Sequence, residues 1–157
     1  MLRISRLTDY GTLVLSQLAK SQKELTSASV IAEATGVKLP TVSKLLKLLA
    51  KAEIVTSARG ANGGYRLSRN AGKISAADII DALEGPINIT ECTADHYQCN
   101  LESNCNLSNA WNRVNSGIIK GLAEISLKEL QSSSGNMPNF KFSGMPVNIQ
   151  HTMYHHD

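Results

Sequence analysis

Apolar residues recur every three or four positions over the first fifty residues, which predicts three consecutive helices. The first is expected at about residues 8–21. The second follows a cap at Thr26 or Ser27 and ends at Gly36, because hydroxyl side chains cap helices and glycine ends them. The third has Pro40 in its first turn, where the missing N–H costs nothing, and runs to about residue 52. The residues expected to face inward are Val30, Ile31 and Ala34 in the second helix and Val42, Leu45, Leu46 and Leu49 in the third.

Two short strands are predicted next, at residues 54–58 and 65–68, on either side of an arginine-led, glycine-rich turn. Two short helices joined by a glycine-containing turn are typical of a helix-turn-helix, and a β-hairpin directly after them is typical of a wing. The alternative is an ordinary amphipathic helix and an ordinary hairpin. Hydroxyls and amines on the third helix can reach bases and phosphates, and Arg59 can enter a minor groove. The candidate DNA-binding residues are Thr41, Ser43, Lys44, Lys47 and Arg59.

The rest of the pattern predicts two more helices with a polar loop between them. Ser75 caps a short helix that Gly85 and Pro86 end, residues 87–105 form the loop, and a long helix covers residues 108–130. We expect residues 131–157, rich in Ser, Gly, Asn, Pro and His, to be mostly disordered. We interpret the apolar stripe of the long helix as a dimer interface, with packing on its own domain as the alternative. The stripe residues are Leu107, Trp111, Val114, Ile118, Leu122 and Ile125.

Composition supports a mainly α fold: a winged helix-turn-helix (residues 1–73) followed by a cysteine loop and a long dimerisation helix (residues 74–130). The 157 residues are 42% hydrophobic but only 4% aromatic, so aliphatic side chains must build the core. There is no apolar run of the roughly 20 residues that a bilayer requires and no signal-peptide pattern, which indicates a cytoplasmic protein without a membrane partner.

Charge is distributed unevenly along the chain. Residues 1–73 hold twelve Lys and Arg and four Asp and Glu, a formal charge of +8. Since the whole chain has a net charge of +3, the remainder has −5. A basic first half joined to an acidic second half favours a polyanion as the partner of the first half alone.

The only cysteines, Cys92, Cys99 and Cys105, lie in the polar loop with the spacing C-x6-C-x5-C. Without C-x2-C pairs a structural zinc site is disfavoured. Three soft thiolates on one loop suit an iron–sulfur cluster, which normally needs a fourth ligand; His96 and Asp9 are candidates. The alternative is a set of free thiols or a disulfide switch. With no C-x-x-C, nucleotide-binding glycine motif or nucleophile–base set beyond these groups, neither an enzyme nor a small-molecule substrate is expected.

Three stretches together resemble the Rrf-type family of winged helix-turn-helix transcriptional regulators over about residues 1–130. They are the Leu-Thr-Asp-Tyr-Gly stretch at residues 7–11, the Arg-Gly-x-x-Gly-Gly-Tyr wing at residues 59–65 and the three-cysteine loop. The first ten residues are similar to the branch that regulates the SUF iron–sulfur assembly system. The resemblance implies a homodimer that binds a double-stranded DNA operator through the candidate residues named above and holds a cluster on the three cysteines.

The chain departs from the IscR-like pattern of the family at one ligand. Ser108 stands where that pattern has a histidine, and the first cysteine gap is one residue longer. Asp9 matches the position at which NsrR-like members supply an aspartate, from the partner subunit, so Asp9 is the first candidate for the fourth ligand and His96 the second. The resemblance therefore implies a regulator of iron–sulfur assembly genes that senses a 2Fe–2S cluster, with 4Fe–4S open. A thiol-switch or nitric-oxide-responsive regulator is the alternative.

Overall fold

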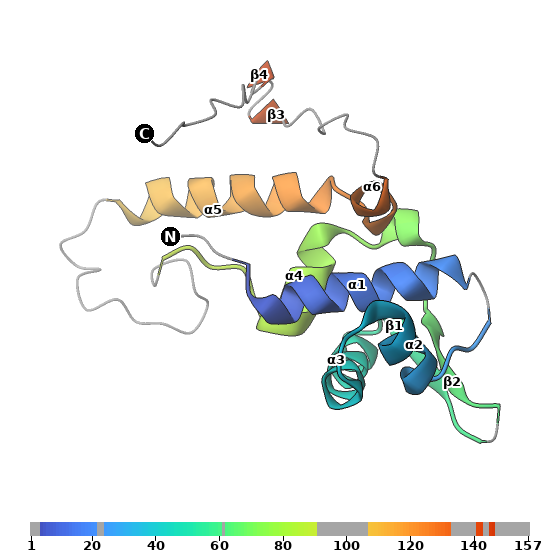
Figure 1. The fold of residues 1–157 in the computed structure, drawn as a ribbon. Helices are drawn as coiled ribbons and strands as arrows, with labels where there is room; N and C mark the ends of the chain where they lie inside the picture. Colours follow the sequence, from blue (N-terminus) through green and yellow to red (C-terminus); the bar gives the residue numbers. More distant parts are fainter. Residues whose placement is uncertain are drawn as a thin grey trace, which may run out of the picture.

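The computed structural model describes residues 4–21, 24–60, 62–90, 107–132, 141–142 and 145–146. These residues form a mainly helical fold with a small β-hairpin wing, which confirms the predicted fold class. Figure 1 shows α3 and the wing at one side of the molecule and α5 at the opposite side. The helical elements are α1 (Arg6–Lys20), α2 (Ala28–Thr35), α3 (Leu39–Lys51), η1 (Ala71–Lys73), α4 (Ala76–Glu84), α5 (Ser108–Ala123) and α6 (Leu127–Gln131); the strands are β1 (Val55–Ala58), β2 (Gly64–Leu67), β3 (Lys141–Phe142) and β4 (Met145–Pro146).

The first helices begin and end where short side-chain signals place them. The Ser5 hydroxyl accepts hydrogen bonds from two backbone N–H groups of the first turn, so α1 begins two residues earlier than expected. Ser27 caps α2 in the same way, and Gly36 ends it in the left-handed conformation at φ 71°. Pro40 lies in the first turn of α3, as the sequence predicted. Local signals therefore fix the helix-turn-helix.

The buried face of α2 differs from the one predicted. Ile31 is fully buried as expected, but Val30 is 51% exposed and Ala34 is also exposed, so these two predictions were wrong. A helix of two turns buries one narrow face, and in α2 that face runs through residues three or four apart. Its partly buried members are Ala28, Ala32 and Thr35. All four residues predicted for the stripe of α3 are fully buried.

The long C-terminal helix predicted at residues 108–130 is interrupted: α5 ends at residue 123 and α6 begins at residue 127. The Ser126 hydroxyl accepts a hydrogen bond from the Glu129 N–H at 3.2 Å, and the Ser126 N–H donates to the Glu129 carboxylate at 2.7 Å. This reciprocal capping box starts a new helix. The sequence contains this capping box as S-x-x-E, but the apolar pattern continues across it and favoured a single helix.

The interruption turns the chain back onto the core. Leu127 is fully buried, and its N–H donates to the Ile74 carbonyl at 2.7 Å. The Ala76 N–H donates to the Ile125 carbonyl at 2.8 Å, and the Gln131 amide reaches the Ser16 carbonyl at 3.0 Å. The segment after α5 is thus tied both to the start of α4 and to α1.

The predicted disorder of residues 131–157 falls largely outside the described residues. Within that stretch the structure describes Gln131 at the end of α6, Ser132, and the antiparallel pair β3–β4. Among the described helices, none combines the length and the apolar character that crossing a bilayer would need.

Candidate nucleic-acid interface

The turn between α2 and α3 presents α3 at the molecular surface. The Gly36 N–H donates to the Ala32 carbonyl at 2.9 Å, and the next residue, Val37, is buried. A left-handed residue followed by an apolar anchor is a compact way to reverse direction, since it satisfies the last carbonyl groups of α2. The inner side of α3 is buried through Leu45 and Leu49, so its opposite side faces outward.

The candidate DNA-binding residues of α3 all reach the surface, to different degrees. Lys44 and Lys47 are exposed, whereas Thr41 and Ser43 are half-buried. Two ammonium groups can therefore reach phosphates, while the hydroxyl groups lie closer to the helix body, where base edges would approach. The exposed cations of α3 and the wing are Lys38, Lys44, Lys47, Lys51, Arg59 and Arg66. This set makes one end of the molecule basic, although Glu33 and Glu53 are also exposed there.

The wing is an antiparallel hairpin in which Val55 pairs with Leu67 and Ala58 with Gly64. Arg59 is exposed at the turn. A Cβ atom at Gly64 would lie 2.8 Å from the backbone of Thr26, and the Thr26 and Tyr65 backbones exchange two hydrogen bonds of 2.9 Å. Only glycine permits this approach. The wing is therefore fixed against the segment that precedes α2, which places Arg59 at the same end of the molecule as α3.

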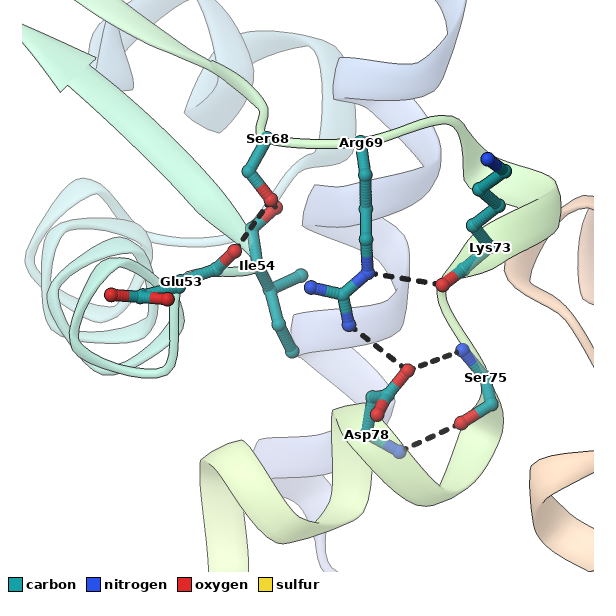
Figure 2. Close-up of polar contacts among 7 residues, drawn as sticks. All are labelled: Glu53, Ile54, Ser68, Arg69, Lys73, Ser75 and Asp78. Atoms are coloured by element: carbon teal, nitrogen blue, oxygen red, sulfur yellow. Dashed lines mark hydrogen bonds and ion pairs between the residues drawn. The ribbon is translucent and has the colours of Figure 1, made fainter.

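Polar side chains fasten the base of the wing, as Figure 2 shows. The Ser68 hydroxyl donates to the Ile54 carbonyl at 2.9 Å, and this hydrogen bond closes the hairpin just after β2 ends. The next residue, Arg69, donates to the Lys73 carbonyl and to the Asp78 carboxylate, each at 3.0 Å. Apolar periodicity does not predict this network, whose only sequence signal is the S-x-x-D cap that begins at residue 75.

Asp78 connects the wing base to α4. Its carboxylate also accepts a hydrogen bond from the Ser75 N–H at 2.9 Å. Partial burial alone would raise the pKa of Asp78, but the hydrogen bonds from Ser75 and Arg69 outweigh it and lower the pKa below its ordinary value. Asp78 is therefore ionised at neutral pH and available to Arg69.

The start of α1, which carries the predicted ligand Asp9, is held by α4. The Glu84 carboxylate accepts hydrogen bonds from the Thr8 hydroxyl and from the Ser5 N–H, the latter at 3.1 Å. The hydrogen bond from Thr8 is the main reason that the pKa of Glu84 is lowered, and burial opposes it only in part. Thr8 is buried while Asp9 is exposed. The Asp9 carboxylate is thus accessible to solvent, on a helix whose first turn is held in place.

The surface of α5 combines exposed apolar side chains with one buried amide. Leu107 is 61% exposed, Trp111 43% and Val114 45%. Asn115, which is 7% exposed, donates to the Ile87 carbonyl at 3.0 Å and accepts a hydrogen bond from the Ile89 N–H at 3.3 Å. The predicted stripe therefore packs only partly on its own domain, and the chain after α4 is attached to α5.

Comparison with known proteins identifies the fold. A family model described as Rrf2, iron-dependent transcriptional regulator, matches residues 4–133. The chain belongs to the Rrf2 family. It is 31% identical to CymR, the global cysteine regulator of B. subtilis, over 83% of this chain and 97% of that one (TM-score 0.63). It is 31% identical to IscR of T. potens over 82% and 85% (TM-score 0.58), and 30% identical to the oxidized form of S. aureus CymR over 83% and 97% (TM-score 0.59).

Membership of the Rrf2 family confirms the resemblance and makes the chain a DNA-binding transcriptional regulator rather than an enzyme. The predicted ligands Cys92, Cys99 and Cys105, and the alternative ligand His96, lie outside the described residues. Within the described ranges no three His, Cys, Asp or Glu side chains gather as a metal site. The three thiols are therefore known as candidate ligands from the sequence alone, whereas the structure shows that Asp9 is exposed.

Proposed function

We propose that this Rrf2 regulator binds its operator as a homodimer and senses an iron–sulfur cluster. The proposal assigns the cluster to Cys92, Cys99 and Cys105. The observation that supports it most directly is the combination of a basic helix-turn-helix and wing with three thiols between α4 and α5. The proposed DNA contacts are Thr41, Ser43, Lys44, Lys47 and Arg59.

Exposed cations support the DNA-binding part of the proposal. Lys44 and Lys47 lie on α3, which a helix-turn-helix inserts into a major groove, and Arg59 lies on the wing, which can reach the adjacent minor groove. Each phosphate that these cations neutralise releases counterions, so affinity should fall steeply with salt concentration. Dimeric binding would space the two α3 helices about one DNA turn, ~34 Å, apart.

The apolar surface of α5 supports a second copy of this chain as the partner. Trp111 and Val114 are nearly half exposed one turn apart, and Leu107 is more exposed still. Large apolar side chains gathered on one helix face are typical of an interface between subunits. In a twofold dimer the same face would meet itself, so these side chains would cover one another.

The proposed cluster fits the available donors. Cysteine thiolates are the usual ligands of iron–sulfur clusters, and Asp9 offers an accessible carboxylate as the fourth ligand, with His96 as the alternative. A cluster in such a site supplies redox sensitivity and lability. We expect a 2Fe–2S form, with 4Fe–4S as the alternative. The description of the matching family model as an iron-dependent transcriptional regulator supports an iron-linked role. We expect iron–sulfur assembly genes as the targets and the cytoplasm as the location.

Contacts of the residues that flank the cysteine segment support a coupling between that segment and the DNA-binding region. The cysteine segment begins just after Ile89, which Asn115 attaches to α5, and α5 packs on α4. We infer that ordering the segment would shift the population of α4 and α5 arrangements, and with it the spacing of the two α3 helices.

Anaerobic purification tests this function. The visible spectrum, iron and acid-labile sulfide would be measured, followed by operator binding with and without the cluster. Absorption above about 400 nm with equimolar iron and sulfide is expected, and Asp9→Ala should make the cluster more labile than His96→Ala does. A protein that stays colourless and iron-free after reconstitution refutes the cluster while leaving DNA binding intact.

A thiol switch without a cluster is the second candidate. The similarity to CymR, described as a global cysteine regulator and also known in an oxidized form, favours it. Its expected signature is a colourless protein under anaerobic conditions whose operator affinity changes with oxidant and recovers with reductant. Replacing Cys92, Cys99 and Cys105 with serine, one at a time, would then identify the thiols that the response requires.

A further inference from the structure

Arg69 joins the wing to the second half of the fold. It directly follows the residue that closes the hairpin, and its guanidinium donates to Asp78 and to the Lys73 carbonyl, each at 3.0 Å (Figure 2). The Asp78 carboxylate accepts from the Ser75 N–H at 2.9 Å, while the Ser75 hydroxyl accepts from the Asp78 N–H at 3.1 Å. One carboxylate thus completes the first turn of α4 and holds the chain that leaves the wing.

The same place also meets the C-terminal helices. Ile74 and Ala76, on either side of the cap, form backbone hydrogen bonds with Leu127 at 2.7 Å and with Ile125 at 2.8 Å. The exit of the wing, the start of α4 and the link between α5 and α6 therefore all form hydrogen bonds with residues 73–78. A displacement of α4 or α5 would act directly on the base of the wing.

We propose that Asp78 is a positioning residue for DNA binding: by holding Arg69 it sets the base of the wing, alongside the Thr26–Tyr65 hydrogen bonds, and so the place of Arg59 relative to α3. This inference rests on the proposed DNA-binding function. Strands rise about 3.3 Å per residue, so Arg59 lies about 15 Å from the hairpin base. A rotation of about 10° at the base would move the wing tip by about 2–3 Å, which is enough to lose a groove contact.

Asp78→Asn separates positioning from simple electrostatics because the two predict opposite changes in the affinity for DNA. The substitution removes a negative charge, so the field of the protein alone predicts tighter binding to DNA. A neutral amide replaces the carboxylate oxygen that accepts from both Ser75 and Arg69, so the hold on Arg69 weakens. This predicts weaker binding to DNA, by about two- to tenfold, the lower end of the range that coupled neighbouring groups give. Asparagine can still accept the hydrogen bond from Ser75, so the helix cap is kept.

Affinity would be measured by fluorescence anisotropy at one fixed salt concentration, on a duplex recovered with the wild-type protein from random sequence. Asp78→Asn and Arg69→Gln should both weaken binding. Lys73→Gln makes the same charge change as Arg69→Gln on a neighbouring exposed cation, and it should have the smaller effect. Arg59→Ala should reduce DNA affinity less in the Asp78→Asn background than in the wild type, because Arg59 is already displaced from its groove contact there.

Stability must be followed in parallel, by thermal unfolding. The two side chains of the pair are 36% and 40% exposed, so their ion pair contributes little to folding, and the melting temperature should change little. If Asp78→Asn does unfold, Arg69→Gln measured against Lys73→Gln decides the question. A Lys73→Gln variant that binds as weakly as Arg69→Gln contradicts a specific role for Arg69.

The remaining outcomes separate this inference from the proposed function. A wild-type protein that recovers no duplex overturns DNA binding and the positioning role together. A wild-type protein that binds, while Asp78→Asn binds equally well or more tightly, overturns the positioning role alone. An unchanged cost of Arg59→Ala in the Asp78→Asn background shows that the pair does not act through the wing arginine.

Discussion

Replacing Leu127 with alanine tests the return of the chain onto the core after α5. The side chain is fully buried, and its backbone N–H is bonded to Ile74. Removing a buried leucine side chain to Cβ costs about 2–5 kcal/mol, as transfer free energy plus a residual cavity. Because α6 has only five residues and can partly relax into the space, we expect about 2–3 kcal/mol. That is a large part of the roughly 5–15 kcal/mol that holds a domain folded.

Leu130→Ala is the matched control on the same helix. Leu130 is 47% exposed, so the identical chemical change should alter stability by about 0.5 kcal/mol or less. Urea unfolding followed by circular dichroism would measure both variants, at one protein concentration, because association would make the midpoint concentration-dependent. An unchanged dependence on urea would show that the same surface is exposed on unfolding.

Equal costs for the two variants would refute the packing of α6. In the continuous helix predicted at residues 108–130, Leu127 lies outside the apolar stripe, so that arrangement assigns it no special burial. The continuous helix therefore predicts a small effect at both positions, and only the docked α6 predicts a large difference between them.

Three further predictions concern the wing and α1. Gly64→Ala would bring its Cβ 2.8 Å from the Thr26 backbone, so it should destabilise the protein by about 1–3 kcal/mol and weaken operator binding, as thermal unfolding and anisotropy would show. Because its pKa is lowered in the folded state, Glu84 should contribute stability that is present above its ordinary pKa of 4.5 and is lost as pH falls through the folded value; Glu84→Gln should flatten that part of the pH–stability curve. Arg59→Ala should weaken operator binding by about 1–3 kcal/mol at fixed salt, and an unchanged affinity would remove the wing from the interface.

Local signals explain how much of the fold the sequence could predict. The Ser27 cap, Gly36 and Pro40 each act within a few residues, so the helix-turn-helix and its boundaries follow from sequence alone. The orientation of Val30 does not, because the face that a two-turn helix buries is decided by its neighbours. The break before α6 was readable as a capping box at Ser126, but the apolar periodicity across it favoured one helix.

The candidate site was predictable from the sequence only in part, for the same reason. Lys44, Lys47 and Arg59 were found because exposed cations on a predicted recognition helix and wing need no knowledge of packing. Arg69 follows β2 and Asp78 lies nine residues later in α4, and only the path of the chain around η1 brings them together. Contacts of this kind depend on tertiary structure, which periodicity and capping signals do not contain.

One shared core joins residues 1–73 to the helices that follow them, and it predicts how fragments behave. Ile74, Ile79, Leu83 and Leu127 are buried in the same cluster as the side chains of α1–α3, and Leu83 packs against Gly11. A fragment of residues 1–73 lacks all four. Each buried aliphatic side chain contributes a few kcal/mol, so their sum approaches the whole stability of a domain. We therefore expect residues 1–73 to be unfolded by circular dichroism and residues 1–132 to fold. A cooperative unfolding transition in the shorter fragment would show that the winged helix-turn-helix is an independent domain and that signals cross a linker rather than a core.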